Sequence, residues 1–161
     1  MEIREATEAD WPAIWPIVET VARAGETFTY PRDLDAAFGQ TLWMPAPPGV
    51  TLVAIEAGRV LGTAKTGPNQ MGPGSHVATA SFMVAAEARG RGVGRALGEA
   101  VIARATRDGY RAMQFNAVVE TNRDAVRLWK SLGFEVIGTA PEAFEHPTGG
   151  FVSLLIMYRP L

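Results

Sequence analysis

The sequence predicts an α/β or α+β domain with a mixed β-sheet. Apolar segments of strand length and of helix length alternate along the chain, which is typical of such layered folds. The segment from Val77 to Val119 has the order strand, helix, strand, so its two strands should be parallel neighbours. A chain of 161 residues suits one hydrophobic core, and we expect a single domain over residues 1–161.

The periodicity of apolar residues places each expected element on the chain. In order, these are the strand Glu2–Thr7, a helix ending near Ala24, a helix Asp33–Met44, the strands Thr51–Glu56, Val60–Thr66 and Ser75–Val84, a helix from about Gly92 to Asp108, the strand Ala112–Val119, a helix Asn122–Leu132, and the strands Phe134–Gly138 and Phe151–Tyr158. Ala57-Gly58 predicts a tight antiparallel hairpin between two of these strands.

Helix ends are marked by capping and breaking residues. Thr7 is followed three residues later by Asp10, the spacing of a capping box, so the first helix should begin there. Gly25 ends this helix, and Gly109 caps the helix that begins near Gly92. Prolines between residues 45 and 48 end the second helix, because proline cannot continue it.

Composition argues against several classes of function. A net charge of -2 and a pI of about 5.7 disfavour nucleic-acid binding. There is no cysteine, which removes disulfides, thiolate metal sites and a covalent acyl-cysteine intermediate. The spacing of His76 and His146 suggests no metal site. No apolar run is long enough for a membrane span and the amino terminus lacks the layout of a signal peptide, so we expect a cytoplasmic protein.

The glycine-rich turn from Arg89 to Gly94 is the most specific feature. It follows a predicted strand and opens a predicted helix, where unpaired N–H groups and the helix dipole favour a phosphate. Glycines let the phosphate approach, and the arginines at 89, 91 and 95 add charge. Neither a P-loop nor a dinucleotide fingerprint fits. The alternative is a purely structural turn. Three glycines at alternate positions, with arginines between them, disfavour this alternative.

This turn and a second motif resemble the GNAT superfamily of N-acetyltransferases. Arg89 to Gly94 matches the acetyl-CoA signature of that family, Arg or Gln followed by x-x-Gly-x-Gly or Ala. NRDAVRLWKSLGF, from Asn122 to Phe134, resembles its Asn-x-x-Ala-x-x-Leu-Tyr-x-x-x-Gly-Phe. The resemblance implies a GNAT-like domain with a mostly antiparallel mixed sheet, helices on both faces, and a central parallel pair that is splayed at the cofactor site.

The resemblance also implies acetyl-CoA as a co-substrate, with no metal. The strand end would hold the pantetheine arm and the turn the pyrophosphate. The residues assigned to acetyl-CoA in this way are Phe82, Met83, Val84, Arg89, Gly90, Arg91, Gly92, Val93, Gly94, Arg95, Asn122, Ala125 and Trp129.

Trp129 stands where the family usually has a tyrosine that protonates the departing CoA thiolate. An indole N–H is too weak an acid for this role. Because a thiol pKa of about 8.5 is only ~1.5 units above neutrality, the missing acid costs about 2 kcal/mol at most. Water or Asn122 can serve instead. A non-catalytic acyl-CoA-binding sensor is the alternative that this departure leaves open.

Four residues are candidates for catalysis at the acceptor. A protonated amine must first lose its proton, at a cost of about 4.6 kcal/mol for an alkylammonium at neutral pH. Glu26, His76 and Glu120 are the candidate bases. Asn116 is the fourth, because Asn116 and Asn122 are spaced like a pair of asparagines in the branch that acetylates proline analogues such as azetidine-2-carboxylate.

The predicted acceptor is a small amine or an amino-acid-like molecule. GETFTYP, from Gly25 to Pro31, is similar to the acceptor-side loop of phosphinothricin acetyltransferases, and no acidic cluster suits a basic peptide tail. Thr79 departs from the proline-analogue branch, which has asparagine there. A protein or peptide acceptor is the alternative. The resemblance also makes a homodimer an expectation.

Overall fold

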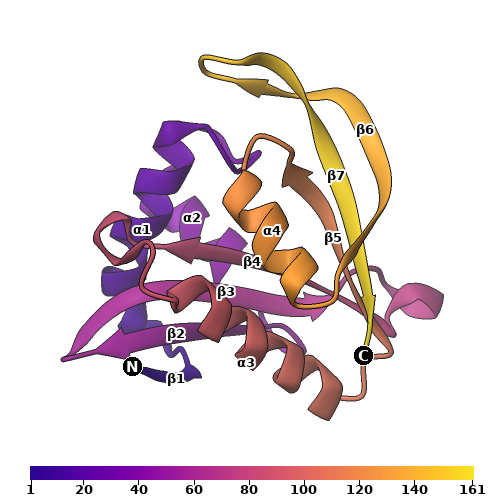
Figure 1. The fold of residues 1–161 in the computed structure, drawn as a ribbon. Helices are drawn as coiled ribbons and strands as arrows, with labels where there is room; N and C mark the ends of the chain where they lie inside the picture. Colours follow the sequence, from indigo (N-terminus) through magenta and orange to yellow (C-terminus); the bar gives the residue numbers. More distant parts are fainter.

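The computed structural model of the protein describes residues 1–161 and contains one seven-stranded sheet in the order β1-β2-β3-β4-β5-β7-β6 (Figure 1). The strands are β1 Glu2–Glu5, β2 Val50–Glu56, β3 Arg59–Pro68, β4 Val77–Val84, β5 Ala112–Val119, β6 Glu135–His146 and β7 Gly150–Pro160. The helices are α1 Trp11–Ala24, α2 Ala36–Trp43, α3 Val93–Arg107 and α4 Arg123–Ser131, with short 3-10 turns at Glu8–Asp10, Gly72–Gly74 and Ala86–Ala88. None of the helices has the length and apolar character to cross a membrane.

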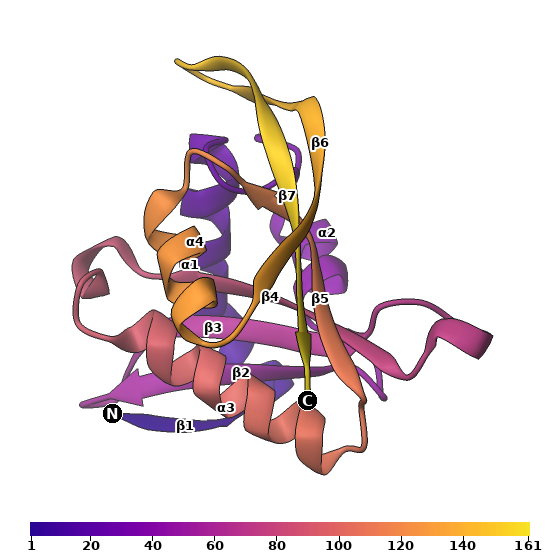
Figure 2. The ribbon, with the colours of Figure 1, turned by 45° about the vertical axis from the view of Figure 1, so that its right-hand side comes forward.

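Helices cover both faces of the sheet (Figures 1 and 2). On one face, the Trp43 indole of α2 donates to the Thr63 hydroxyl of β3 at 3.0 Å. On the other face, α3 packs so closely on β3 that a Cβ added to Gly62 would lie 2.8 Å from Val93. The core therefore lies in two layers, one on each side of the sheet, as the sequence predicted.

The central parallel pair is splayed. β4 and β5 pair only at Val77–Ala112 and Ala78–Met113, although both strands continue for several more residues, and Figure 1 shows them diverging. A register shift between Phe115 and Val118 interrupts the pairing of β5 with its antiparallel partner β7 in the same part of the sheet. The predicted fold, including this splay, is confirmed.

The C-terminal hairpin is longer than the sequence indicated. We predicted a short strand that ends at Gly138, but β6 continues to His146 and pairs with β7 in a long ribbon (Figure 1). A register shift between Ala140 and Phe144 places Glu142 at a φ of 52° and accommodates Pro141. Glycine and proline therefore produced an irregularity within the ribbon and did not end the strand.

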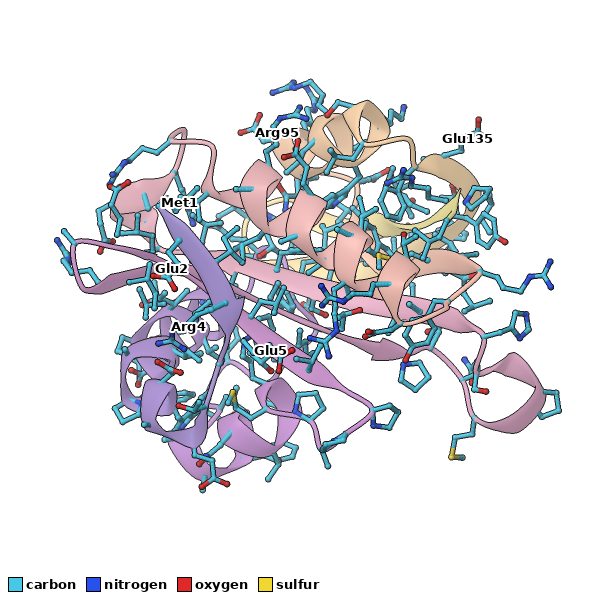
Figure 3. All side chains as sticks on the ribbon, turned by 90° about the horizontal axis from the view of Figure 1, so that it is seen from below. Met1, Glu2, Arg4, Glu5, Arg95 and Glu135 are labelled. Atoms are coloured by element: carbon cyan, nitrogen blue, oxygen red, sulfur yellow. The ribbon has the colours of Figure 1, made fainter.

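The start of the first helix follows the predicted capping pattern. The Thr7 N–H donates to the Asp10 carboxylate at 2.7 Å, and the Arg4 guanidinium donates to both carboxylate oxygens. These donors hold the pKa of Asp10 well below its usual value, with the Arg4 hydrogen bond as the largest cause. Arg4 and Glu5 lie on β1, at the edge of the sheet (Figure 3).

Candidate active site

The turn between β4 and α3 carries backbone N–H groups that have no partner in the protein. The N–H groups of Gly90, Gly92, Val93, Gly94 and Arg95 make no hydrogen bond to backbone or side chains. They lie at the amino end of α3, where unpaired donors and the helix dipole produce partial positive charge. Such a turn favours a phosphate group as its ligand.

Two glycines give the turn its shape. Gly90 and Gly92 have φ values of 75° and 81°, in the left-handed region that residues with a Cβ adopt only with strain. A Cβ placed on either glycine would meet no atom within 4 Å. The turn therefore combines unpaired N–H donors with open space beside both glycines.

A cavity beside this turn, here called the turn cavity, collects most of the residues that the resemblance assigns to acetyl-CoA. Those that line it are Phe82, Met83, Val84, Arg89, Gly90, Gly92, Val93, Gly94, Arg95, Asn122, Ala125 and Trp129. Arg91 does not line it, because its guanidinium pairs with the Glu56 carboxylate elsewhere. Arg95 lies at the start of α3 beside α4 (Figure 3), and its guanidinium donates to the Ser131 hydroxyl at 2.8 Å.

The second half of β4 presents unpaired backbone groups to the gap between β4 and β5. The Ala85 N–H donates to the Leu61 carbonyl of β3 at 2.9 Å. This bond fixes which residues of β4 point their backbone N–H and C=O groups toward β3 and which point them away. Ala80, Phe82 and Val84 therefore turn their N–H and C=O groups away from β3. Because β5 does not pair with them, an extended ligand with amide groups can take the place of the missing strand.

A second cavity, here called the loop cavity, opens beside residues 27–30, which connect α1 to α2. Its polar side chains come from this connection, β3, β4, β5 and the start of α4: Thr27, Thr29, Tyr30, Lys65, Thr79, Ser81, Asn116 and Asn122. Six residues line both cavities: Thr27, Phe28, Phe82, Asn122, Ala125 and Trp129. The two cavities therefore meet at the splay, where a ligand in one can contact a ligand in the other.

Trp129 belongs to an aromatic cluster between the two cavities. It is 7% exposed, and its ring centroid lies 4.5 Å from that of Phe82 and 5.0 Å from that of Phe115. The protein has no fully buried side-chain N or O atom without a hydrogen-bond partner, so the indole N–H is not a buried, unpaired donor. The side chain therefore packs as a core residue while its polar edge stays accessible to a ligand.

The two asparagines are held by different contacts. The Asn122 side-chain oxygen accepts from the Ala125 N–H at 3.4 Å and caps α4, which leaves its amide N–H groups free. Asn116 exchanges two amide hydrogen bonds with Asn69, at 2.6 and 3.3 Å, and accepts a third from Gln114. Asn116 is therefore already oriented before any ligand binds.

The structure does not bring the candidate bases together. His76 precedes β4 at its paired end, away from the splay, and lines neither cavity. Glu120 lines neither cavity, and its carboxylate accepts from the Ser153 N–H at 3.0 Å. Glu26 lines the turn cavity and is exposed.

Lys65 and His146 are among the site residues that sequence reasoning missed. Lys65 lines the loop cavity, but a lysine in an alternating strand gives no signal of its own. His146 lines the turn cavity, and we had expected a loop there. Its Nδ1 accepts from the N–H groups of Thr148 and Gly149, which places the proton of the neutral ring on Nε2.

In the loop cavity, burial raises the pKa of Tyr30 to about 12, so its hydroxyl stays neutral.

Comparisons with known proteins identify the family and the fold of the chain. Residues 3–134 match the model of the Acetyltransferase (GNAT) family. A GCN5-related N-acetyltransferase structure from Kribbella flavida is 58% identical, with a TM-score of 0.96 over 99% of this chain and 97% of that chain. The structure of yncA from Salmonella typhimurium with its cofactor acetyl-CoA is 28% identical, with a TM-score of 0.85 over 100% of this chain and 94% of that chain.

A curated relative matches only part of the chain. The N-acetyltransferase aca1 of Schizosaccharomyces pombe is 34% identical over 99 residues, which are 62% of this chain. The matched segment is 47% of aca1, so this chain spans about half the length of that relative.

Proposed function

Because the chain belongs to the acetyltransferase (GNAT) family and uses acetyl-CoA as co-substrate, we propose that it transfers the acetyl group directly to the nitrogen of a small amine or amino-acid-like acceptor. One observation carries this proposal: the turn cavity and the loop cavity meet at the splay between β4 and β5. A thioester in the first cavity and an amine in the second can therefore come into contact without a covalent enzyme intermediate.

The turn and β4 are proposed to hold acetyl-CoA. The five unpaired N–H groups from Gly90 to Arg95 suit the pyrophosphate, and Arg89 adds charge beside them. The outward backbone groups of Phe82 and Val84 suit the amides of the pantetheine arm. The thioester then lies beside Trp129, where the two cavities join.

In the proposed reaction the neutral amine attacks the thioester carbonyl, the C–N bond forms, and the C–S bond breaks. The amine must first lose a proton, and Glu26 is the one candidate base that lines either cavity. We propose that water carries the proton to Glu26, and we do not include His76 and Glu120. Asn122 and the Trp129 N–H can donate hydrogen bonds near the leaving thiolate, which water then protonates.

A small acceptor is favoured over a protein or peptide. No acidic side chain lines the loop cavity, whereas a basic peptide tail is recognised by carboxylates. Asn116, oriented at the rim by Asn69, suits an amino-acid-like molecule. A relationship to the proline-analogue branch or to phosphinothricin acetyltransferases is part of this proposal.

An acceptor screen by CoA-thiol release tests the proposal. The panel contains proline analogues, phosphinothricin, polyamines and short peptides, and acetyl-CoA binding is measured in parallel by calorimetry. We expect turnover with at least one small amine and none with the peptides. Acetyl-CoA binding without thiol release from any acceptor would instead identify a non-catalytic sensor.

The cytoplasmic location and the homodimer are also proposals. Val136 and Ile137 lie exposed on the edge strand β6, and exposed apolar edges favour association. Sedimentation and cell fractionation test these two proposals.

A further inference from the structure

Lys65 is the one charged side chain that lines the loop cavity. All other lining side chains are apolar, hydroxyl-bearing or amide-bearing, and none is Asp, Glu, Arg or His. A charged group in a cavity with low-dielectric walls dominates the local potential. The loop cavity is therefore a positive site with no carboxylate to neutralise it.

The surroundings of Lys65 hold its ammonium without cancelling its charge. Its Nζ donates to the Leu42 carbonyl near the end of α2 and lies 5.6 Å from the Tyr30 ring and 5.5 Å from the Trp43 ring. Lys65 takes part in none of the ion pairs of the protein. An ammonium has three N–H donors, so donors remain for a ligand.

The strand register turns Lys65 toward the splay. Lys65 of β3 is directly opposite Ser81 of β4, so their side chains lie on the same face of the sheet. Ser81 and Thr79 also line the loop cavity with Lys65 and add hydroxyl groups to this face of the sheet. Together they form a small polar surface with hydroxyl groups and a cation, which is suited to an anionic group.

We propose that Lys65 binds a carboxylate of the acceptor, so that the acceptor is a compact amino acid and not a simple amine or polyamine. This inference rests on the proposed function, because it requires the acceptor to occupy the loop cavity. Burial lowers the pKa of the Lys65 ammonium, and a carboxylate beside it would offset that desolvation. A polyamine, by contrast, would bring positive charge toward an unpaired cation.

Two other roles for Lys65 compete with this one. In the first, the ammonium serves only to stabilise the end of α2, where a cation favours the unpaired carbonyls. In the second, Lys65 is the base that deprotonates the acceptor. Either role would affect acceptors with and without a carboxylate alike, and this difference separates them from carboxylate binding.

The test compares kcat/KM for α-amino acids and their primary carboxamides in the wild-type chain and in Lys65→Met. Because a carboxamide also changes the amine pKa of the acceptor, the informative quantity is the change in the acid-to-amide ratio between variants. We expect Lys65→Met to lower this ratio by about 10- to 100-fold, mainly through KM of the acid. Lys65→Arg should keep the ratio within about 3-fold of wild type.

The controls separate folding from recognition. Lys130→Met removes an exposed lysine of α4 and should leave the ratio unchanged. Acetyl-CoA affinity and the midpoint of thermal unfolding check that Lys65→Met remains folded, and Lys65→Gln provides a second neutral variant.

If thiol release continues but the acid-to-amide ratio of kcat/KM is unchanged in Lys65→Met, the carboxylate role is overturned. An equal loss of kcat/KM for acid and amide has the same meaning. Turnover with polyamines alone overturns it too. If acetyl-CoA binds but the wild-type chain releases no thiol with any acceptor, the proposed function itself fails.

Discussion

The turn cavity and the loop cavity meet at one point but are built from different chemical groups. The turn cavity presents main-chain N–H groups at the start of α3 and along β4. The loop cavity presents side chains, among them Lys65, Thr79 and Asn116. Substitutions should therefore act differently on the two sides. Backbone conformation and added charge matter most in the turn cavity, whereas each polar side chain matters in the loop cavity.

The largest effect is expected from Gly92→Glu. Its carboxylate would occupy the proposed phosphate site and repel a pyrophosphate, so acetyl-CoA affinity should fall at least about 100-fold. Gly58→Glu is the matched control, because Gly58 also has a positive φ, 75°, and open space, but lies in the β2–β3 hairpin. Both variants should lose about 1–3 kcal/mol of stability from backbone strain. Equal acetyl-CoA affinities of the two variants by calorimetry would show that the turn is not the phosphate site.

A smaller effect is expected when one arginine of the turn is removed. Arg89 lines the turn cavity, and Arg91 pairs with Glu56 outside it. Arg89→Ala should weaken acetyl-CoA binding by about 10-fold, with a reduced dependence on salt. Arg91→Ala should stay within about 2-fold of wild type. Calorimetry at two salt concentrations measures acetyl-CoA affinity in both variants. A larger loss of affinity in Arg91→Ala than in Arg89→Ala would contradict the assignment of Arg89 to the acetyl-CoA site.

Trp129→Tyr changes the point where the two cavities meet. A tyrosine hydroxyl can protonate the leaving thiolate, so we expect kcat to rise by about 3-fold. This rise is well below the one that would result from recovering the full cost of the missing acid, about 2 kcal/mol. Because Trp129 packs against Phe82 and Phe115, the smaller ring should also cost about 1–3 kcal/mol of stability. Thiol release and thermal unfolding measure the two effects. Trp129→Phe, which lacks the hydroxyl, should lose stability without the gain in kcat.

The smallest effect on activity is expected from Asp10→Asn, because Asp10 lines neither cavity. Asp10 has a lowered pKa in the folded protein, so its contribution to stability is present above the unfolded pKa of about 3.9 and is lost as the pH falls below it. Asp10→Asn should lower the free energy of unfolding by about 1 kcal/mol at pH 7, and the difference should shrink below about pH 4. Activity at pH 7 should remain unchanged. Denaturant unfolding at several pH values checks this, and a constant difference would contradict the role of the ionised carboxylate.

The sequence predicted the turn and the fold because both depend on local patterns. Arg89 to Gly94 is contiguous, and its position between a strand and a helix is enough to leave the N–H groups of the helix start unpaired. The order of strands and helices then placed β4 beside β5. The same reasoning ended β6 too early, because the antiparallel partner β7 sustains the ribbon past Gly138 and Pro141.

By itself the sequence determined the family resemblance, the layered sheet and the glycine-rich turn between β4 and α3, since these follow from residues close together in the chain. Tertiary structure decided which further side chains join Asn116 and the Gly25–Pro31 loop at the loop cavity. Lys65 and Ser81 come from separate strands, and they line the cavity together because the register of β3 and β4 puts them on one face of the sheet. The structure also decided where β4 and β5 separate, because they pair only at Val77–Ala112 and Ala78–Met113, and this leaves His76 at the paired end.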